Sequence, residues 1–348
     1  MRLDGSGIVL LGAVATAATA VLLAVSWDRA TGWLRAALAA ACVLAVVATA
    51  GLQLNRMVEA YPSWSALTGV AAAGSAAVHP GSAIAAARPP ADPAGGGTLI
   101  SVRVDGRTSG LNLPMFVYLP PGYQGERRLR YPVIEAAHGY PGSPRTWIRR
   151  LDVKAYLDRE IAAGRMAPTV VLMPYQTPAQ LRDTECTDLV GGPRAETFLT
   201  RDVPAYARAH LRVRADRAAW GLIGYSAGGF CATNLLLRHP GEYAAAASLS
   251  GYATPGIAVG DGSEMTMNDD AWRLANLPQP PASLFLAWAA DDPPARRNAL
   301  LLAGLAHAPL VVTTAVVAHG GHSDPAWRAM EAPAFDWLSA HLIRPATG

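Results

Sequence analysis

The stretch WGLIGYSAGGFC, residues 220–231, decides how the second half of this chain is interpreted. Apolar residues typical of a buried strand run into Gly-Tyr-Ser-Ala-Gly, residues 224–228, and a helical pattern follows. Small residues permit a tight strand-to-helix turn, which lifts the serine hydroxyl clear of the sheet, and the start of the helix favours negative charge. The segment therefore predicts that Ser226 is a nucleophile. The alternative is a glycine-rich helix start with a capping serine.

Short runs rich in Val, Ile and Leu alternate with longer helical patterns on both sides of this turn, from Thr98 onward. Near-continuous apolar strands separated by helices indicate a mostly parallel sheet with helices on both faces. We predict an α/β fold of about eight strands, at residues 98–104, 114–119, 132–137, 169–174, 218–224, 245–249, 283–289 and 310–317. Helices are predicted at residues 152–163, 196–210, 227–239, 294–306 and 325–341.

A nucleophilic serine needs a base, and the base needs an acid that orients it. Where a serine lies on such a turn, both groups follow it along the chain, each in a loop after a later strand. Asp291 and Asp292 follow the seventh predicted strand, and His319 and His322 follow the eighth. We favour His322, because it follows a Gly-Gly turn just ahead of the last helix, and Asp292, with Asp291 and His319 kept as alternates.

A tetrahedral oxyanion needs hydrogen-bond donors that are already in place. Ala227 offers one backbone N–H at the start of the helix. The second donor is expected in the loop after the third predicted strand, which reads HGYPG, residues 138–142. We assign the N–H of Tyr140, with Gly139 as the alternate, and interpret His138 as a hydrogen-bonding loop residue.

The three cysteines show no Cys-x-x-Cys spacing, which argues against a zinc ribbon and a thioredoxin-like motif. Cys186 lies in the long loop after the fourth predicted strand, and Cys231 lies five residues after Ser226. Both belong to the edge of the sheet where active-site loops gather, so we predict a disulfide, which persists only in an oxidising compartment. The alternative is two unpaired thiols in a domain that faces the cytoplasm. Cys42 is interpreted as a small apolar packing residue.

The first 90 residues hold only 8 of the 55 charged residues, so the chain has two parts of different character. Two apolar stretches, residues 7–25 and 36–54, are each near the length that crosses a bilayer. A charged turn with two tryptophans joins them, residues 27–35. We predict a hairpin of two transmembrane helices, because the alternative of a cleaved signal peptide leaves the second stretch unexplained.

The predicted domains are a membrane anchor at residues 1–60, an Ala/Gly/Pro-rich tether at 61–97 and a catalytic domain at 98–348. Two spans place the N-terminus and the catalytic domain on the same side. If the catalytic domain is extracytoplasmic, Arg29 and Arg35 lie in a cytoplasmic turn. This agrees with the enrichment of positive charges in cytoplasmic loops. The predicted location is therefore the cell membrane, as a multi-pass protein.

Net charge argues against a nucleic-acid partner. The formal charge is only +3, the cations are dispersed arginines, and Lys154 is the only lysine. The expected partners are an ester or acyl-lipid substrate and the lipid bilayer.

The second half of the chain resembles the putative-esterase family of α/β-hydrolases, which groups esterase D-like and feruloyl esterase-like enzymes with secreted mycolyltransferases. The resemblance spans roughly residues 102–342. It rests on YLPPGY (118–123), His138-Gly139, ETFLTRDVP (196–204), GYSAGG (224–229) and GGHS (320–323). It implies the α/β-hydrolase fold and a Ser226, Asp292 and His322 triad that needs no metal or organic cofactor.

One departure from the family bears on the reaction. DPAW, residues 324–327, follows His322-Ser323, where mycolyltransferase-like members place a tryptophan directly, and this counts against transfer to a sugar. We therefore predict a membrane-anchored serine esterase that acts on carboxylic esters through an acyl-serine intermediate. The alternatives are an acyltransferase that passes an acyl chain to an envelope sugar or lipid alcohol, a serine peptidase, and a non-catalytic envelope protein that binds a partner.

Overall fold

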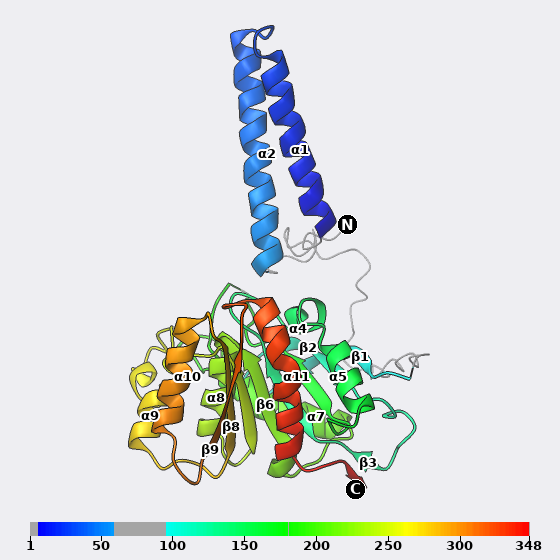
Figure 1. The fold of residues 1–348 in the computed structure, drawn as a ribbon, viewed down its shortest axis with the longest axis vertical. Helices are drawn as coiled ribbons and strands as arrows, with labels where there is room; N and C mark the ends of the chain where they lie inside the picture. The colour runs from blue at the N-terminus through cyan, green and yellow to red at the C-terminus, as the bar shows by residue number, and fades with distance from the viewer. Residues whose placement is uncertain (1–5, 59–94, 180, 348) are drawn as a thin grey trace. The chain divides into compact units, whose positions relative to one another are not determined.

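The computed structural model describes residues 6–58, 95–179 and 181–347 (Figure 1). The chain forms two units, Met1–Ala87 and Arg88–Gly348. Most of the predicted tether lies outside the described residues.

The first unit contains two apolar helices, α1 (Ser6–Ser26) and α2 (Gly32–Val58), each long and apolar enough to cross a membrane. The helices contact each other, and Thr16 Oγ1 hydrogen-bonds Thr49 Oγ1 across the pair at 3.0 Å. Gly12 allows this approach, since a Cβ there would lie 2.8 Å from Thr49 Oγ1. Both predicted stretches fall inside these helices, although α2 begins earlier than expected.

The second unit is built on an eight-stranded sheet in the order β1-β2-β5-β4-β6-β7-β8-β9. From β5 to β9 neighbouring strands run parallel, and β1 and β2 add an antiparallel edge. This confirms the predicted mostly parallel sheet. The strands are β1 (Thr98–Asp105), β2 (Asn112–Leu119), β4 (Val133–Ala137), β5 (Val170–Pro174), β6 (Trp220–Tyr225), β7 (Ala245–Leu249), β8 (Ser283–Ala289) and β9 (Val311–Val317).

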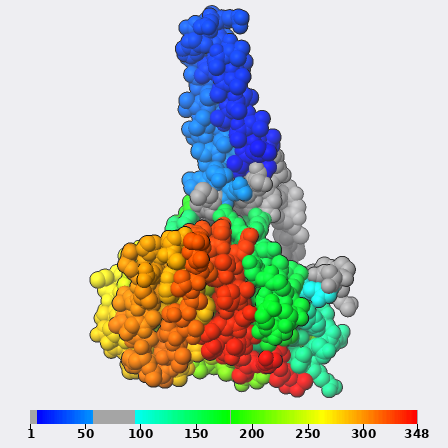
Figure 2. Space-filling model, viewed as in Figure 1, coloured from blue at the N-terminus to red at the C-terminus, as the bar shows by residue number. Residues whose placement is uncertain are grey.

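Helices cover both faces of this sheet, which is why β4 to β7 are buried along their whole length. On one face, α4 (Arg145–Arg149), α5 (Val153–Ala162) and α11 (Asp324–His341) share one hydrophobic cluster. Figure 2 shows α5 and α11 side by side on this face. The opposite face carries α7 (Val203–His210), α8 (Ala227–Arg238), α9 (Asp270–Asn276) and α10 (Pro293–Leu305).

The structure divides the helix predicted at 196–210 into three segments. A short α6 (Ala195–Thr197) leads into a π-helical turn, Phe198–Asp202, before α7. Pro204 has no N–H to donate to the carbonyl four residues earlier, and the Thr200 hydroxyl donates to Glu196 O. The backbone there widens, and the N–H of Val203 reaches Phe198 O.

Several short elements were not predicted. These are α4, α9 and a small sheet of β3 (Leu129–Arg130) with β10 (Ala346–Thr347). Each is too short to produce a recognisable hydrophobic period.

The join between β6 and α8 depends on glycine. A Cβ at Gly224 would overlap the backbone carbonyl of Gly228, and no rotamer change can relieve a clash with backbone. We expect Gly224→Ala to lower the free energy of unfolding by about 3 kcal/mol, the upper range for an overpacked core. Urea unfolding of the full chain, followed by tryptophan fluorescence, measures this change.

Gly304→Ala is the matched control, because Gly304 lies in α10 with open space around it. Alanine there is expected to raise the free energy of unfolding by roughly 0.5 kcal/mol through helix propensity. Equal effects of the two substitutions would contradict this account of the join.

Candidate active site

Ser226 lies on the sharp turn between β6 and α8. Its backbone has φ 55° and ψ −123°, a conformation that an L-residue adopts only when its surroundings enforce it. The N–H of Ser226 donates to Leu249 O, and its carbonyl accepts from the N–H groups of Gly229 and Phe230. Gly228 packs so closely on Ala137 O that a Cβ would overlap it. These contacts hold the serine at the carboxyl end of β6.

The structure brings Ser226, His322 and Asp292 into one hydrogen-bonded chain. His322 Nε2 lies 2.9 Å from Ser226 Oγ, and His322 Nδ1 lies 2.8 Å from Asp292 Oδ2. An Nδ1–H that donates to the carboxylate leaves Nε2 free to accept from the serine. Asp292 is 4% exposed, and its other oxygen caps α10 by accepting from Ala295 N at 3.2 Å.

Asp291 has a different set of partners. Its two oxygens accept from the N–H groups of Gly320 and Gly321, at 3.1 and 2.8 Å. These bonds hold the pKa of the Asp291 carboxyl below its usual range. Asp291 therefore fixes the turn that carries His322. The alternate base, His319, is exposed and makes no hydrogen bond within the described ranges.

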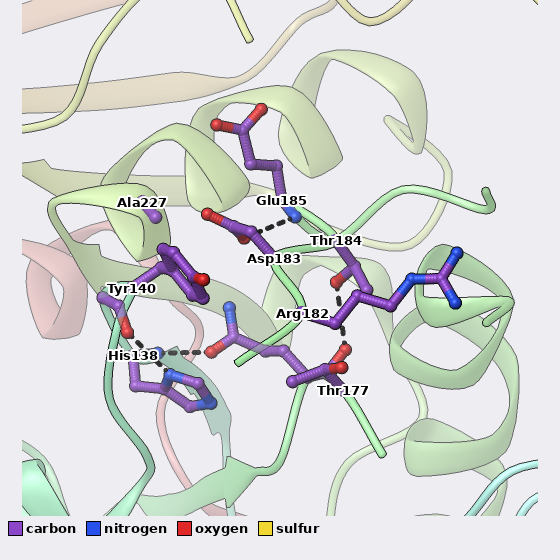
Figure 3. A pocket seen from close by; sticks show the side chains of 10 residues that line it. His138, Tyr140, Thr177, Arg182, Asp183, Thr184, Glu185 and Ala227 are labelled. Carbon is purple, nitrogen blue, oxygen red and sulfur yellow. Dashed lines mark hydrogen bonds between the residues drawn. The ribbon is translucent and has the colours of Figure 1, made fainter. Parts of the chain in front are cut away.

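The loop after β4 lies against the serine turn. A Cβ at Gly139 would lie 2.7 Å from the Tyr225 ring and 3.2 Å from Ser226 Cβ, so glycine permits this contact. Tyr140 and Ala227 line the same small cavity (Figure 3). Neither of their backbone N–H groups donates a hydrogen bond to any described residue. Both amides are thus available to a ligand.

A disulfide joins Cys186 to Cys231. It links the long loop after β5 to the helix that begins beside the serine, as the sequence position of the two residues predicts. Gln176 lies next to it and accepts from the N–H of His138 at 2.8 Å, which ties the loop after β4 to the loop after β5.

Trp327 is part of this site in a way that the sequence did not reveal. Its ring meets the His322 ring edge-on, with centroids 5.1 Å apart, and leans on the Tyr225 ring at 4.7 Å. Trp327 is 9% exposed, whereas the His322 side chain is 44% exposed. The tryptophan packs one side of the imidazole and leaves another side open. The only sequence signal was the position of Trp327 four residues after the end of GGHS.

A metal centre has no evident ligand set here. Among the described residues, no group of three or more His, Cys, Asp or Glu side chains is arranged to hold a metal ion.

The comparison with family models identifies one family. The family model described as "Putative esterase" matches residues 107–338. An uncharacterized protein of Corynebacterium glutamicum is 27% identical over 331 residues, covering 89% of this chain and 77% of that protein. Esterase Rv1288 of Mycobacterium tuberculosis is 30% identical over 145 residues, covering 42% of this chain and 30% of that protein.

Solved structures show the same fold. A ferulic acid esterase matches with a TM-score of 0.63 and 19% identity, covering 71% of this chain and 99% of that chain. An S-formylglutathione hydrolase of Agrobacterium tumefaciens matches with a TM-score of 0.60 and 16% identity, covering 72% of this chain and 98% of that chain.

Asp291 and Asp292 have different hydrogen-bond partners, so we expect different losses of activity when each is substituted. Asp292→Asn removes the acceptor charge beside His322 Nδ1, so we expect kcat for a p-nitrophenyl ester to fall about 10⁴-fold. Asp291→Ala only loosens the turn that holds His322, so a loss of about tenfold is expected. Equal and mild losses in both variants would mean that the acid of this site lies elsewhere.

Proposed function

The chain belongs to the family described as putative esterases, and from that premise we propose that this carboxylic ester hydrolase is anchored in a membrane and acts through an acyl intermediate on Ser226. The observation that carries the mechanism is the chain of two hydrogen bonds, 2.9 and 2.8 Å long, from Ser226 through His322 to Asp292. The order serine, acid, histidine along the sequence agrees with the fold.

The first half of the proposed reaction forms the acyl-enzyme. Ser226 Oγ attacks the carbonyl carbon of the ester while its proton passes to His322 Nε2. Asp292 keeps the Nδ1–H in place and stabilises the imidazolium. The carbonyl oxygen becomes an oxyanion that the N–H groups of Tyr140 and Ala227 bind. When the tetrahedral intermediate collapses, His322 returns the proton to the leaving alcohol.

The second half of the reaction releases the acid. Water gives a proton to His322 and attacks the acyl carbon, and collapse of the second intermediate restores the Ser226 hydroxyl. An alcohol in place of water would give acyl transfer instead. The two outcomes use the same residues and differ only in which acceptor reaches the acyl carbon.

The test of the nucleophile is Ser226→Ala. Because only the hydroxyl can carry the acyl group, we expect esterase activity to fall by roughly 10⁴-fold or more. The variant should also lose covalent labelling by a fluorophosphonate, read by mass spectrometry of the intact protein. Normal turnover or normal labelling of the variant would refute the assignment.

For the anchor, we propose that α1 and α2 span the membrane as a hairpin and that the catalytic unit lies outside the cytoplasm. Two features support this orientation. The Cys186–Cys231 disulfide needs an oxidising compartment, and Arg29 and Arg35 stand at the turn between the helices. Such an anchor favours lipidic or envelope esters as substrates.

Two added cysteines test this orientation. Gly241→Cys places a thiol on the surface of the catalytic unit, where the position has open space, and Asp28→Cys places one in the exposed turn between the helices. A membrane-impermeant maleimide should label Gly241→Cys in intact cells and Asp28→Cys only after lysis. The unsubstituted chain reports any background from Cys42. The reverse pattern would overturn the orientation.

A further inference from the structure

A cavity of about 10 Å³ is lined by Tyr140 and Ala227, whose amides are assigned to the oxyanion. That volume holds roughly one water-sized group. Tyr140 and Ala227 form one side of the cavity, and residues 182–185 form the opposite side (Figure 3). A group that enters this cavity lies beside Tyr140 and Ala227, the two residues assigned to the oxyanion.

The opposite side belongs to a constrained segment, residues 181–188, that we name the acidic loop. Its position is fixed by the Cys186–Cys231 disulfide and by the Thr184 hydroxyl, which donates to Gln176 O at 3.1 Å. Tyr140 Oη also donates to Leu181 O, which connects this loop to the loop that supplies the oxyanion amides. The geometry of the cavity is therefore set from both sides.

Two neighbouring acids of the acidic loop have different environments. The Glu185 carboxylate is buried and accepts from Tyr252 Oη at 2.6 Å and from Gly256 N at 2.9 Å. These bonds join the acidic loop to the segment after β7. Glu185 thus serves the structure of the site and is already supplied with donors.

Asp183 has no side-chain donor among the described residues. It is half-buried, and its side chain accepts from the N–H of Glu185 at 3.0 Å and from the N–H of Thr184. Within the described ranges it forms no ion pair, and the guanidinium of neighbouring Arg182 lies against Gly192 instead. Figure 3 shows the Asp183 carboxylate directed toward Tyr140 and Ala227 and Arg182 directed away. Burial raises the pKa of Asp183, as expected for a carboxylate without a counter-charge.

An unneutralised carboxylate in this position has an electrostatic consequence. It opposes the negative charge that develops on the carbonyl oxygen of the substrate. A hydrogen-bond donor placed between the two groups weakens that opposition and gives the carboxylate a donor from outside its own loop.

We propose that Asp183 is a specificity-determining residue, which accepts a hydrogen bond from a hydroxyl group carried by the ester substrate. The proposal rests on the esterase function and on the Ser226 mechanism proposed above. The cavity holds roughly one water-sized group, which a hydroxyl matches and a quaternary ammonium group exceeds. A hydroxylated ester therefore binds better than its plain counterpart.

The experiment compares three esters of similar size, hydrolysed by the full chain in detergent. Ethyl butyrate is the plain ester, 2-hydroxyethyl butyrate carries a hydroxyl on the alcohol, and ethyl 3-hydroxybutyrate carries one on the acyl chain. The readout is the ratio of kcat/KM between each hydroxylated ester and ethyl butyrate, which cancels any general loss of activity. Butyrylcholine provides a cationic comparison, and fluorophosphonate labelling counts the folded active sites.

The expected ratio is about tenfold for one of the two hydroxylated esters, the effect of one hydrogen bond to a charged group. Which ester shows it tells whether the cavity receives the alcohol or the acyl side. Asp183→Ala should reduce the ratio to about one, and Asp183→Asn, which keeps an acceptor but no charge, should give an intermediate ratio. Asp261→Ala, a change of an exposed acid outside this cavity, should leave the ratio unchanged.

Three results would overturn the proposal: no preference in the unsubstituted chain, a preference that survives Asp183→Ala, or a preference for butyrylcholine that Asp183→Ala abolishes. Failure of the underlying esterase mechanism looks different. In that case the unsubstituted chain would hydrolyse none of the esters, or Ser226→Ala would hydrolyse them equally well.

Discussion

The close approach of α8 to the ends of β4 and β6 is the constraint on which the rest of the site depends. Gly228 touches the carbonyl of Ala137, and Gly224 touches the carbonyl of Gly228, so the backbones meet with no room for a side chain. This contact fixes Ser226 in its strained conformation and places the loop after β4 beside it. Two strands and a helix pack around Ser226, and this packing stabilises its strained backbone conformation.

Parallel strands bring the remaining groups to the same edge of the sheet. The loops after β8 and β9 carry Asp292 and His322, and these strands are neighbours in the sheet. The separation between the acid and the histidine is thus set by strand pairing, and the Asp291 bonds to the Gly320–Gly321 turn adjust the final position of the imidazole. Precision at the site arises from the register of the sheet together with one short network of hydrogen bonds.

The sequence revealed those features that follow from strand order. Ser226 and His322 could be placed because each follows a recognisable buried strand. Asp291 and Asp292 could only be ranked, since adjacent residues share one strand end and differ only in the direction of their side chains. The π-helical turn before Pro204 and the ring contact of Trp327 with His322 depend on tertiary packing, which leaves no periodic signal. The role of Asp183 was hidden because the path of the acidic loop is set by a disulfide, by Tyr252 and by Gly256.

Four acids near the site illustrate how partners decide what a carboxylate does. Asp292 faces an imidazole and caps a helix, Asp291 faces two backbone amides, and Glu185 faces a phenol and an amide. Each of these three accepts a hydrogen bond from another segment of the chain, and each thereby fixes a loop. Asp183 faces the cavity, and its partners are the backbone amides of Thr184 and Glu185 in its own loop. Because a partly buried carboxylate without a counter-charge is costly, a donor carried by the substrate of Ser226 would lower that cost, which is the role proposed for the substrate hydroxyl.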